Sequence, residues 1–214
     1  MTRAEAGEEN VNTMIRVVKN TIQTQSGFTL VELMLGLAIF FILAVAGVPS
    51  YIGYVRNGEL SNTTTTLFAD LHYARSEAIK RKTRVTLCQS DDVTVTNPVC
   101  GSTARTWSSG WLVFVDVGGT TGSLDTGSGD VLLRIGRPPT TNIAIKSNTN
   151  ADDYFEYNSD GSLNIVNAPV VYAVCDDRDH DGDYDESTGR NIRIGAIGRP
   201  EITVGSISSC DNPS

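Results

Sequence analysis

The sequence predicts an α+β protein in which one long N-terminal helix packs on an antiparallel β-rich globular head. Three observations predict this fold: an apolar run from residue 28, an apolar stripe of helical period that continues to about residue 84, and short β-branched segments after it. The 214 residues suffice for one membrane-type segment and one domain with a real core. We therefore expect a leader at 1–27, an apolar helix at 28–51, an amphipathic helix at 52–84 and a head at 85–214.

The leader, Met1 to Gly27, is polar and has no hydrophobic stretch of its own. Its three bases and three acids cancel, so the remainder of the chain carries the whole net charge of −8. A start at Met14 would leave only Arg16 and Lys19 as charges, as the positive-inside rule favours for a cytoplasmic leader. The sequence leaves both starts open.

The apolar helix, Phe28 to Val48, carries a single charge, Glu32. These 21 residues form about 30 Å of helix, which matches the hydrocarbon thickness of a bilayer. A cleaved secretory signal places its cleavage site after the apolar core. Here the candidate cleavage site, Gly27–Phe28, precedes the core.

Glu32 is costly in lipid, so it needs a partner, a function or access to water. Cleavage before Phe28 would create an α-amino group one helical turn away. The carboxylate would then pair with the amine of a neighbouring copy, where both groups are desolvated. The alternative is an acid that reaches the membrane surface. Physical chemistry alone leaves both interpretations open.

The residues Gly27 to Leu33, GFTLVEL, followed by an apolar helix, resemble the N-terminus of type IV pilins and type II secretion pseudopilins. The resemblance implies that a prepilin peptidase cleaves after Gly27 and methylates Phe28. It also implies that Glu32 sets the register of subunits in a filament. Pro49 matches a helix proline of the family, and we expect a kink or local melting there because proline removes one helix hydrogen bond.

The amphipathic helix is predicted from an apolar stripe and ends between Arg81 and Arg84. The stripe comprises Leu60, Leu67, Leu71, Ala74 and Ala78, and polar residues are expected on the other faces, namely Asn62, Asp70, Arg75, Glu77 and Lys80. The basic cluster at its end is interpreted as a solvated helix terminus in preference to a phosphate site; it comprises Lys80, Arg81, Lys82 and Arg84.

The head is predicted to contain seven or eight short strands separated by turn residues. The candidate strands are Val85–Gln89, Trp111–Val115, Asp130–Ile135, Ile143–Lys146, Tyr154–Asn158, Val170–Cys175, Ile192–Ala196 and Ile202–Val204.

Four cysteines lie beyond the apolar segment, at Cys88, Cys100, Cys175 and Cys210. None belongs to a CxxC pair, which disfavours zinc. Their even number favours two disulfides formed in an oxidising compartment, with three possible connectivities, over four free buried thiols.

The head resembles the GspH/FimT/FimU branch of minor pilins and pseudopilins. The matching segments are LHYARSEAIKRKTRVTLCQS (71–90), GWLVFVD (110–116), DVLLRIG (130–136), YNSDGSL (157–163), VCDDR (174–178) and IGRP (197–200). In this group cysteines pair locally, which implies the disulfides Cys88–Cys100 and Cys175–Cys210.

An acidic stretch lies between the predicted strands Val170–Cys175 and Ile192–Ala196. Its aspartates Asp177, Asp179, Asp181 and Asp185 fit positions 1, 3, 5 and 9 of a calcium loop, with Gly182 at position 6 and Asp183 between them. Position 12, where an EF-hand has a glutamate, is Thr188, and no helices flank the loop. A looser calcium loop and a solvated hairpin insertion both remain open, so calcium is the one cofactor considered.

No pattern in the sequence predicts an enzyme. Asp125-Thr-Gly-Ser128 matches the short signature of aspartic proteases, but that chemistry needs a second aspartate on its own loop, and no second triplet exists. The two histidines, His72 and His180, have no nucleophile or zinc pattern around them.

The acidic net charge disfavours general nucleic-acid binding. Arg199 is the candidate DNA contact, because Gly198-Arg199-Pro200-Glu201 resembles a segment of DNA-binding minor pilins of the FimT kind. Those proteins carry a second arginine where this chain has Glu201. We therefore interpret the segment as a β-turn before the last strand.

The resemblance implies a minor pilin that is incorporated into, or primes, a type IV pilus. The alternatives are a GspH-like pseudopilin of a type II secretion system and a DNA-binding minor pilin. The implied partners are other pilins, the prepilin peptidase and an inner-membrane assembly platform. The implied location is a single pass through the inner membrane with a periplasmic head, and then the pilus or pseudopilus.

Overall fold

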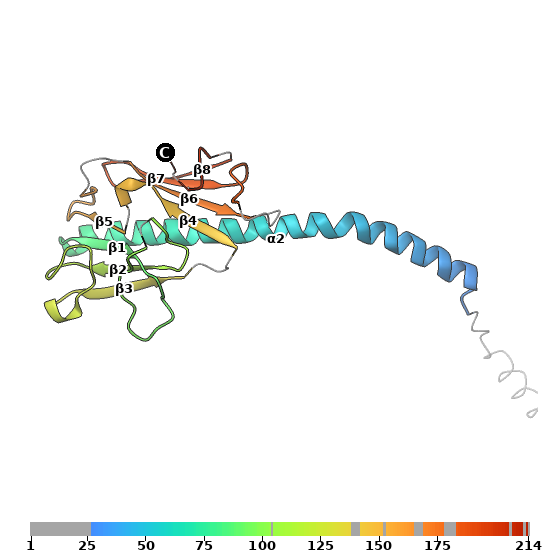
Figure 1. Cartoon of the computed structure of the whole chain (residues 1–214), viewed down its shortest axis with the longest axis horizontal. Helices are drawn as coiled ribbons and strands as arrows, with labels where there is room; N and C mark the ends of the chain where they lie inside the picture. Colours follow the sequence, from blue (N-terminus) through green and yellow to red (C-terminus); the bar gives the residue numbers. More distant parts are fainter. Residues whose placement is uncertain are drawn as a thin grey trace, which may run out of the picture. The chain divides into compact units, whose positions relative to one another are not determined.

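The computed structural model describes residues 27–103, 105–137, 142–151, 153–164, 169–177, 183–205, 207–211 and 213, without the side chains of residues 46–50 and 150. The chain divides into two compact units, Met1–Ser50 and Tyr51–Ser214. Helix α2, Leu30–Arg81, contributes to both, and each unit is described separately (Figure 1).

The helix in the first unit begins with a side-chain cap. Thr29 precedes the first helical residue, and its Oγ1 accepts a hydrogen bond of 3.2 Å from the Glu32 backbone N–H. The Leu33 N–H donates to the Thr29 carbonyl at 3.1 Å. A threonine at this position satisfies N–H groups that the first helical turn leaves unpaired. The apolar side chains that follow are exposed, for example Phe40 and Phe41, each at 63%.

Among the residues whose side chains are described, no helical stretch is both long and apolar enough to cross a membrane.

The backbone of α2 is helical at Pro49, so the local melting that we expected there is wrong. Proline removes one hydrogen bond, and the turns on either side hold the helix together. The kink stays a prediction.

In the second unit, one face of α2 forms the centre of the core. All five residues of the predicted stripe, Leu60, Leu67, Leu71, Ala74 and Ala78, are fully buried, which confirms the predicted face. Two threonines are buried beside them, and their hydroxyls donate to the carbonyls four residues earlier. These bonds satisfy the hydroxyls inside the helix.

The helix ends at a backbone conformation that glycine usually adopts. Lys82 has φ +54°, and the Thr83 N–H bonds back to the Ala78 carbonyl at 3.3 Å. This is the Schellman arrangement, in which the residue after the C-cap is left-handed. Arg81 and Lys80 both pair with Glu77.

The head contains two four-stranded antiparallel sheets (Figure 1). The first has the order β3-β2-β1-β5 and comprises β1 (Val85–Gln89), β2 (Trp111–Val115), β3 (Val131–Gly136) and β5 (Tyr154–Tyr157). The second has the order β4-β6-β7-β8 and comprises β4 (Ile143–Ser147), β6 (Val170–Asp176), β7 (Arg190–Ile194) and β8 (Pro200–Val204). Two short 3-10 helices, η1 (Thr126–Ser128) and η2 (Thr149–Ala151), complete the described elements.

Alternation along the strands divides the buried side chains between two faces. Val85 and Leu87 of β1, like Tyr172 and Val174 of β6, join α2 in one shared core. The intervening side chains, including Cys88 and Cys175, form a separate small cluster on the outer face of each sheet. This arrangement explains why β1, β2 and β6 are buried at every position.

The observed strands confirm the predicted α+β fold, and most bounds agree within one residue. The exception is the β7–β8 hairpin, where the predicted bounds are two residues too late at the start of each strand. The predicted bounds came from the apolar alternation, which continues to Ala196. The chain in fact turns at Gly195, whose carbonyl accepts from the Gly198 N–H at 2.8 Å.

Candidate functional site

The segment around the predicted cleavage site is exposed and non-helical. Residues 27–29 precede α2, and the Phe28 side chain is 84% exposed. A peptidase requires accessible backbone outside regular structure, and Gly27–Phe28 has both properties. Glu32 lies exposed in the first turn of α2, where its negative charge also complements the helix dipole.

Thr29 has a capping role that we did not predict. The spacing Thr-x-x-Glu at Thr29 and Glu32 is the signature of a capping box and would have placed the helix start. The structure contains one half of that arrangement, the bond from the Glu32 N–H to Thr29. Glu32 therefore occupies the third helical position of α2, independently of any role of its carboxylate.

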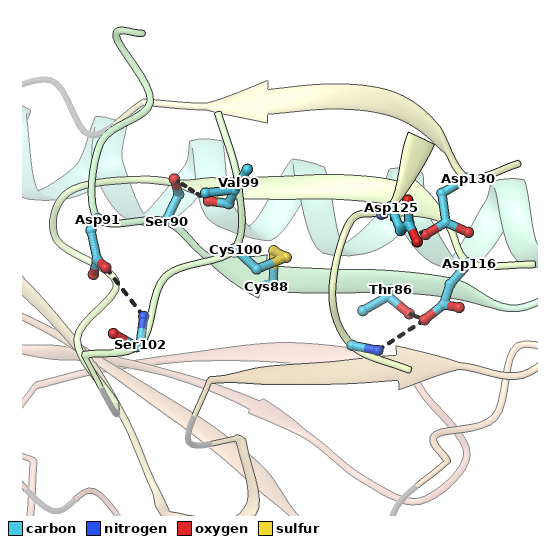
Figure 2. Close-up of a disulfide and its surroundings, with 11 residues drawn as sticks. Thr86, Cys88, Ser90, Asp91, Val99, Cys100, Ser102, Asp116, Asp125 and Asp130 are labelled. Atoms are coloured by element: carbon cyan, nitrogen blue, oxygen red, sulfur yellow. Dashed lines mark hydrogen bonds between the residues drawn. A yellow bond between two sulfur atoms is a disulfide. The ribbon is translucent and has the colours of Figure 1, made fainter. Parts of the chain in front are cut away.

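The first disulfide, Cys88–Cys100, is present as the resemblance implied, and it fastens a loop to the outer face of β1 (Figure 2). Hydrogen bonds close the same loop. Ser90 Oγ donates to the Val99 carbonyl at 2.7 Å, and the Ser102 N–H donates to Asp91 Oδ2 at 3.2 Å (Figure 2).

The second disulfide, Cys175–Cys210, is also present and holds the C-terminal segment against the outer face of β6. Ile207 packs in the same cluster, and its N–H donates to the Glu186 carbonyl at 3.0 Å. The pairing confirms the connectivity that the resemblance implied.

Arg84 differs from the solvated base that we predicted. Its Nη2 lies 2.9 Å from Asp116 Oδ1, and its Nε lies 3.2 Å from Glu156 Oε1. The other Asp116 oxygen accepts from Thr86 Oγ1 and from the Gly122 N–H (Figure 2). Two buried carboxylates thus need one cation, which draws Arg84 into the head.

Asp70 was predicted on a face of the helix other than the apolar stripe, and this prediction is wrong, because the residue is buried with the stripe. It is 1% exposed, accepts a 2.9 Å hydrogen bond from Trp111 Nε1, and lies 2.9 Å from Arg134 Nε. Burial raises the pKa of Asp70, although the Trp111 hydrogen bond and the Arg134 charge oppose that rise. Glu77 is also buried, at 6%, because it sits beneath Arg81 and Lys80.

Arg75 donates hydrogen bonds to two turns, which lie in the family-like segments 157–163 and 197–200. Its Nε donates to the Gly161 carbonyl at 3.0 Å and its Nη2 to the Ile197 carbonyl at 3.1 Å. Gly198 has φ +75°, and a Cβ there would lie 2.0 Å from the Gly161 oxygen. Only glycine allows the two turns to approach this closely.

Arg199, the candidate DNA contact, is exposed next to this pair of turns. Burial and then the charges of Arg75 and Arg199 lower the pKa of His72, so the His72 ring lies close to both guanidinium groups. Glu201 lies opposite Arg193 on the neighbouring strand. DNA binding through Arg199 stays a prediction.

Residues 178–182 of the candidate calcium loop, including Asp179 and Asp181, lie outside the described residues. Asp177, Asp183 and Asp185 are described, and the Asp185 N–H donates to the Asp176 carbonyl at 2.8 Å. Within the described part of the chain, no group of three or more metal-ligating side chains comes together. Calcium binding also stays a prediction.

The protease-like segment Asp125–Ser128 has a structural role. Asp125 caps η1, and its two oxygens accept from the Gly127 N–H at 3.0 Å and from Ser128 Oγ at 2.6 Å. These bonds hold the pKa of Asp125 below its usual value. Asp130 closes the same loop by accepting from the backbone N–H groups of Val117, Gly118 and Asp125.

Known families match both the N-terminal segment and the head of this chain. A family model described as type II transport protein GspH matches residues 63–198, and one described as the prokaryotic N-terminal methylation motif matches residues 22–48. Fimbrial protein Q of Moraxella bovis is 31% identical over 130 residues, which cover 58% of this chain and 76% of that protein.

The fold is similar to two crystal structures of the type IV minor pilin FimU of Pseudomonas aeruginosa. The TM-scores are 0.55 and 0.51, at 20% identity. The similar regions cover 73% and 70% of this chain and 98% of each FimU chain. At this identity the likeness shows a shared fold.

Proposed function

The chain is a type IV minor-pilin-like member of the GspH family, and we propose that it acts by assembly, as a subunit incorporated into or priming a pilus. Its partners would be other major and minor pilins, a prepilin peptidase and an inner-membrane assembly platform. The observation that carries this proposal is the first unit, where exposed apolar side chains of α2 surround a single acid close to an accessible candidate cleavage site.

Cleavage after Gly27 would place the new α-amino group of Phe28 beside the first turn of α2. The amine and Glu32 of one chain would be close to each other. When the apolar helix packs among those of other subunits, both charged groups become buried, and each needs a partner. A carboxylate that meets an amine from a neighbouring subunit removes the cost of burying either charge alone. Pairing at one position along the helix would also fix the axial register of the subunits.

The proposed location follows from the same segment. The apolar helix would hold the precursor in the inner membrane with its head in the periplasm, before the helix moves into the filament. The two disulfides support this orientation, because they persist in an oxidising compartment.

Glu32→Ala tests the proposal, with Glu201→Ala as the matched control on the exposed surface of the head. We expect both variants to be cleaved, with a methylated Phe28 at the mature N-terminus by mass spectrometry. Only Glu32→Ala should be missing from sheared filaments on an immunoblot, by tenfold or more. Equal incorporation of both variants would contradict the proposed role of the acid.

The match to the GspH model favours one second candidate, a pseudopilin of a type II secretion system. A deletion strain separates the two functions. Loss of surface filaments with normal export of secreted enzymes supports the pilus, whereas the reverse phenotype supports the secretion system.

A further inference from the structure

The two sulfur atoms of the second disulfide differ in accessibility. Cys175 is fully buried on the outer face of β6, whereas Cys210 is 4% exposed and lines an open hollow of about 470 Å³. A Cβ on Gly189 would lie 3.4 Å from Cys175 Sγ, so the residue before β7 packs closely over that sulfur. A reagent in solvent therefore reaches this disulfide through Cys210.

The hollow that leads to Cys210 is acidic. Four of the seven described residues that line it carry carboxylates, namely Asp183, Asp185, Glu186 and Asp211. Most of the lining belongs to the stretch 177–186, which holds six acids and a single arginine. Arg190, at the start of β7, is not among the lining residues. Negative charge gathered around a concave surface gives a strong local potential, so the hollow repels anions.

Reduction of a disulfide begins when a thiolate attacks one of the two sulfurs. At Cys210, a bond would form between the sulfur of the reagent and Cys210 Sγ, and the electron pair of the broken bond would stay on Cys175 Sγ. A second thiolate then attacks the sulfur that the reagent left on Cys210 and releases the Cys210 thiolate. In total, two thiols of the reagent become one disulfide, and their two protons end on the two cysteines.

Two features of the site oppose the first of these steps. The attacking thiolate must bring its negative charge into the acidic hollow. The leaving thiolate would form on Cys175, which lies in an apolar cluster with Ala173 and Ile207, and such surroundings disfavour an anion. The bond should therefore be reduced slowly by thiols that carry additional negative charge.

The first disulfide has a more open setting. Cys100 is only partly buried, and it fastens an exposed loop to the outer face of β1 (Figure 2). Asp91 and Asp92 are the acids of this loop, and Arg137 donates to one of its backbone carbonyls at 3.4 Å. A base thus offsets part of the negative charge there. The two disulfides of one molecule provide an internal comparison.

We propose that the acidic hollow is an electrostatic barrier over the Cys175–Cys210 disulfide, which excludes anionic thiols and admits thiols that carry a positive charge. The Cys88–Cys100 disulfide has no such barrier, so anionic thiols open its loop first and leave the C-terminal segment attached. An oxidoreductase that acts on Cys210 needs positive charge around its own reactive sulfur. This device is independent of the proposed function in assembly.

Three small thiols test the barrier on the full-length chain in detergent micelles: cysteamine, 2-mercaptoethanol and 2-mercaptoethanesulfonate. Their thiolate forms carry no net charge, one negative charge and two negative charges, respectively. Iodoacetamide is added at intervals to alkylate the released cysteines, and mass spectrometry quantifies each pair. Rates are divided by the concentration of thiolate, which corrects for the different thiol pKa values of the reagents.

The measured quantity is the preference for cysteamine over the sulfonate, given as the ratio of the two rates. At low ionic strength, roughly 10 mM, we expect this preference to be about tenfold larger at Cys175–Cys210 than at Cys88–Cys100. Near roughly 1 M salt, screening should bring the two preferences to within about twofold of each other. Equal preferences at low salt, or a difference that salt leaves unchanged, would overturn the barrier.

Neutral variants locate the charge that is responsible. Glu186→Gln combined with Asp211→Asn removes two carboxylates of the hollow and should lower the preference at Cys175–Cys210 about threefold or more. Glu201→Gln is the control, because this exposed acid lies on β8 opposite Arg193 and does not line the hollow. An equal effect of the control would refute the assignment to the hollow. The salt series needs no variant, so it decides the question even where a variant fails to fold.

Discussion

Removing the Cys175–Cys210 disulfide should destabilise the head more than removing Cys88–Cys100. The bonds close segments with sequence separations of 35 and 12 residues. In the chain-entropy model, these loops correspond to about 3.8 and about 2.8 kcal/mol at 25 °C. The paired substitutions are Cys175→Ala with Cys210→Ala, and Cys88→Ala with Cys100→Ala, because alanine adds no polar atom to the small clusters that contain these sulfurs.

The assay is urea denaturation of the full-length chain in detergent, followed by tryptophan fluorescence. Trp107 and Trp111 are both fully buried, and both belong to the core shared by the sheets and α2. The variant that lacks the longer loop should lose about 1 kcal/mol more free energy of unfolding than the other. A larger loss for the Cys88–Cys100 variant, with unchanged m-values, would refute the assumption that loop closure dominates.

Three changes in backbone or charge and one ligand titration test other parts of the structure. Lys82→Gly should stabilise the protein by about 1 kcal/mol in the same urea assay, because glycine adopts the left-handed conformation without a Cβ penalty. Gly198→Ala should cost about 2 kcal/mol or more in thermal unfolding, since its Cβ would collide with the Gly161 carbonyl. The stability of the unmodified chain relative to Asp70→Asn should fall as the pH rises from 3.8 through the raised folded-state pKa, measured by urea titrations at several pH values. Calorimetry should show calcium binding that Asp181→Asn weakens, and no heat with the unmodified chain would contradict a calcium loop.

The sequence predicted the elements of the head because burial imposes a period on each of them. The stripe from Leu60 to Ala78 has helical spacing, and β1 and β2 are short β-branched or aromatic runs between turns. The bounds of the β7–β8 hairpin were less accurate, since Ala196 continues the alternation of Ile192 and Ile194. Tertiary contacts at Gly198 end the strand, and no local pattern encodes them.

The buried charges could not be predicted from one sequence. Asp70 has a residue type that is usually solvated, although its spacing from Leu67 and Ala74 is that of the apolar stripe, and Arg84 follows a run of bases. Their burial depends on partners far along the chain: Trp111 and Arg134 for Asp70, and Asp116 for Arg84. The stripe was defined by apolar residue types alone, so a paired carboxylate at the same helical spacing was left out of it.

Both disulfides occupy equivalent places in the architecture, and this has a consequence for the order of unfolding. Cys88 and Cys175 lie on inner strands of the two sheets, on the faces turned away from the shared core. Their partners bring in segments with few apolar residues, which bury too little surface to stay ordered by packing alone. Covalent attachment thus replaces a third layer of secondary structure. One of these segments carries Ile207, whose N–H donates to the Glu186 carbonyl, so oxidation also holds the chain that precedes β7. We therefore expect reduction to release these outer segments before it unfolds the core around α2.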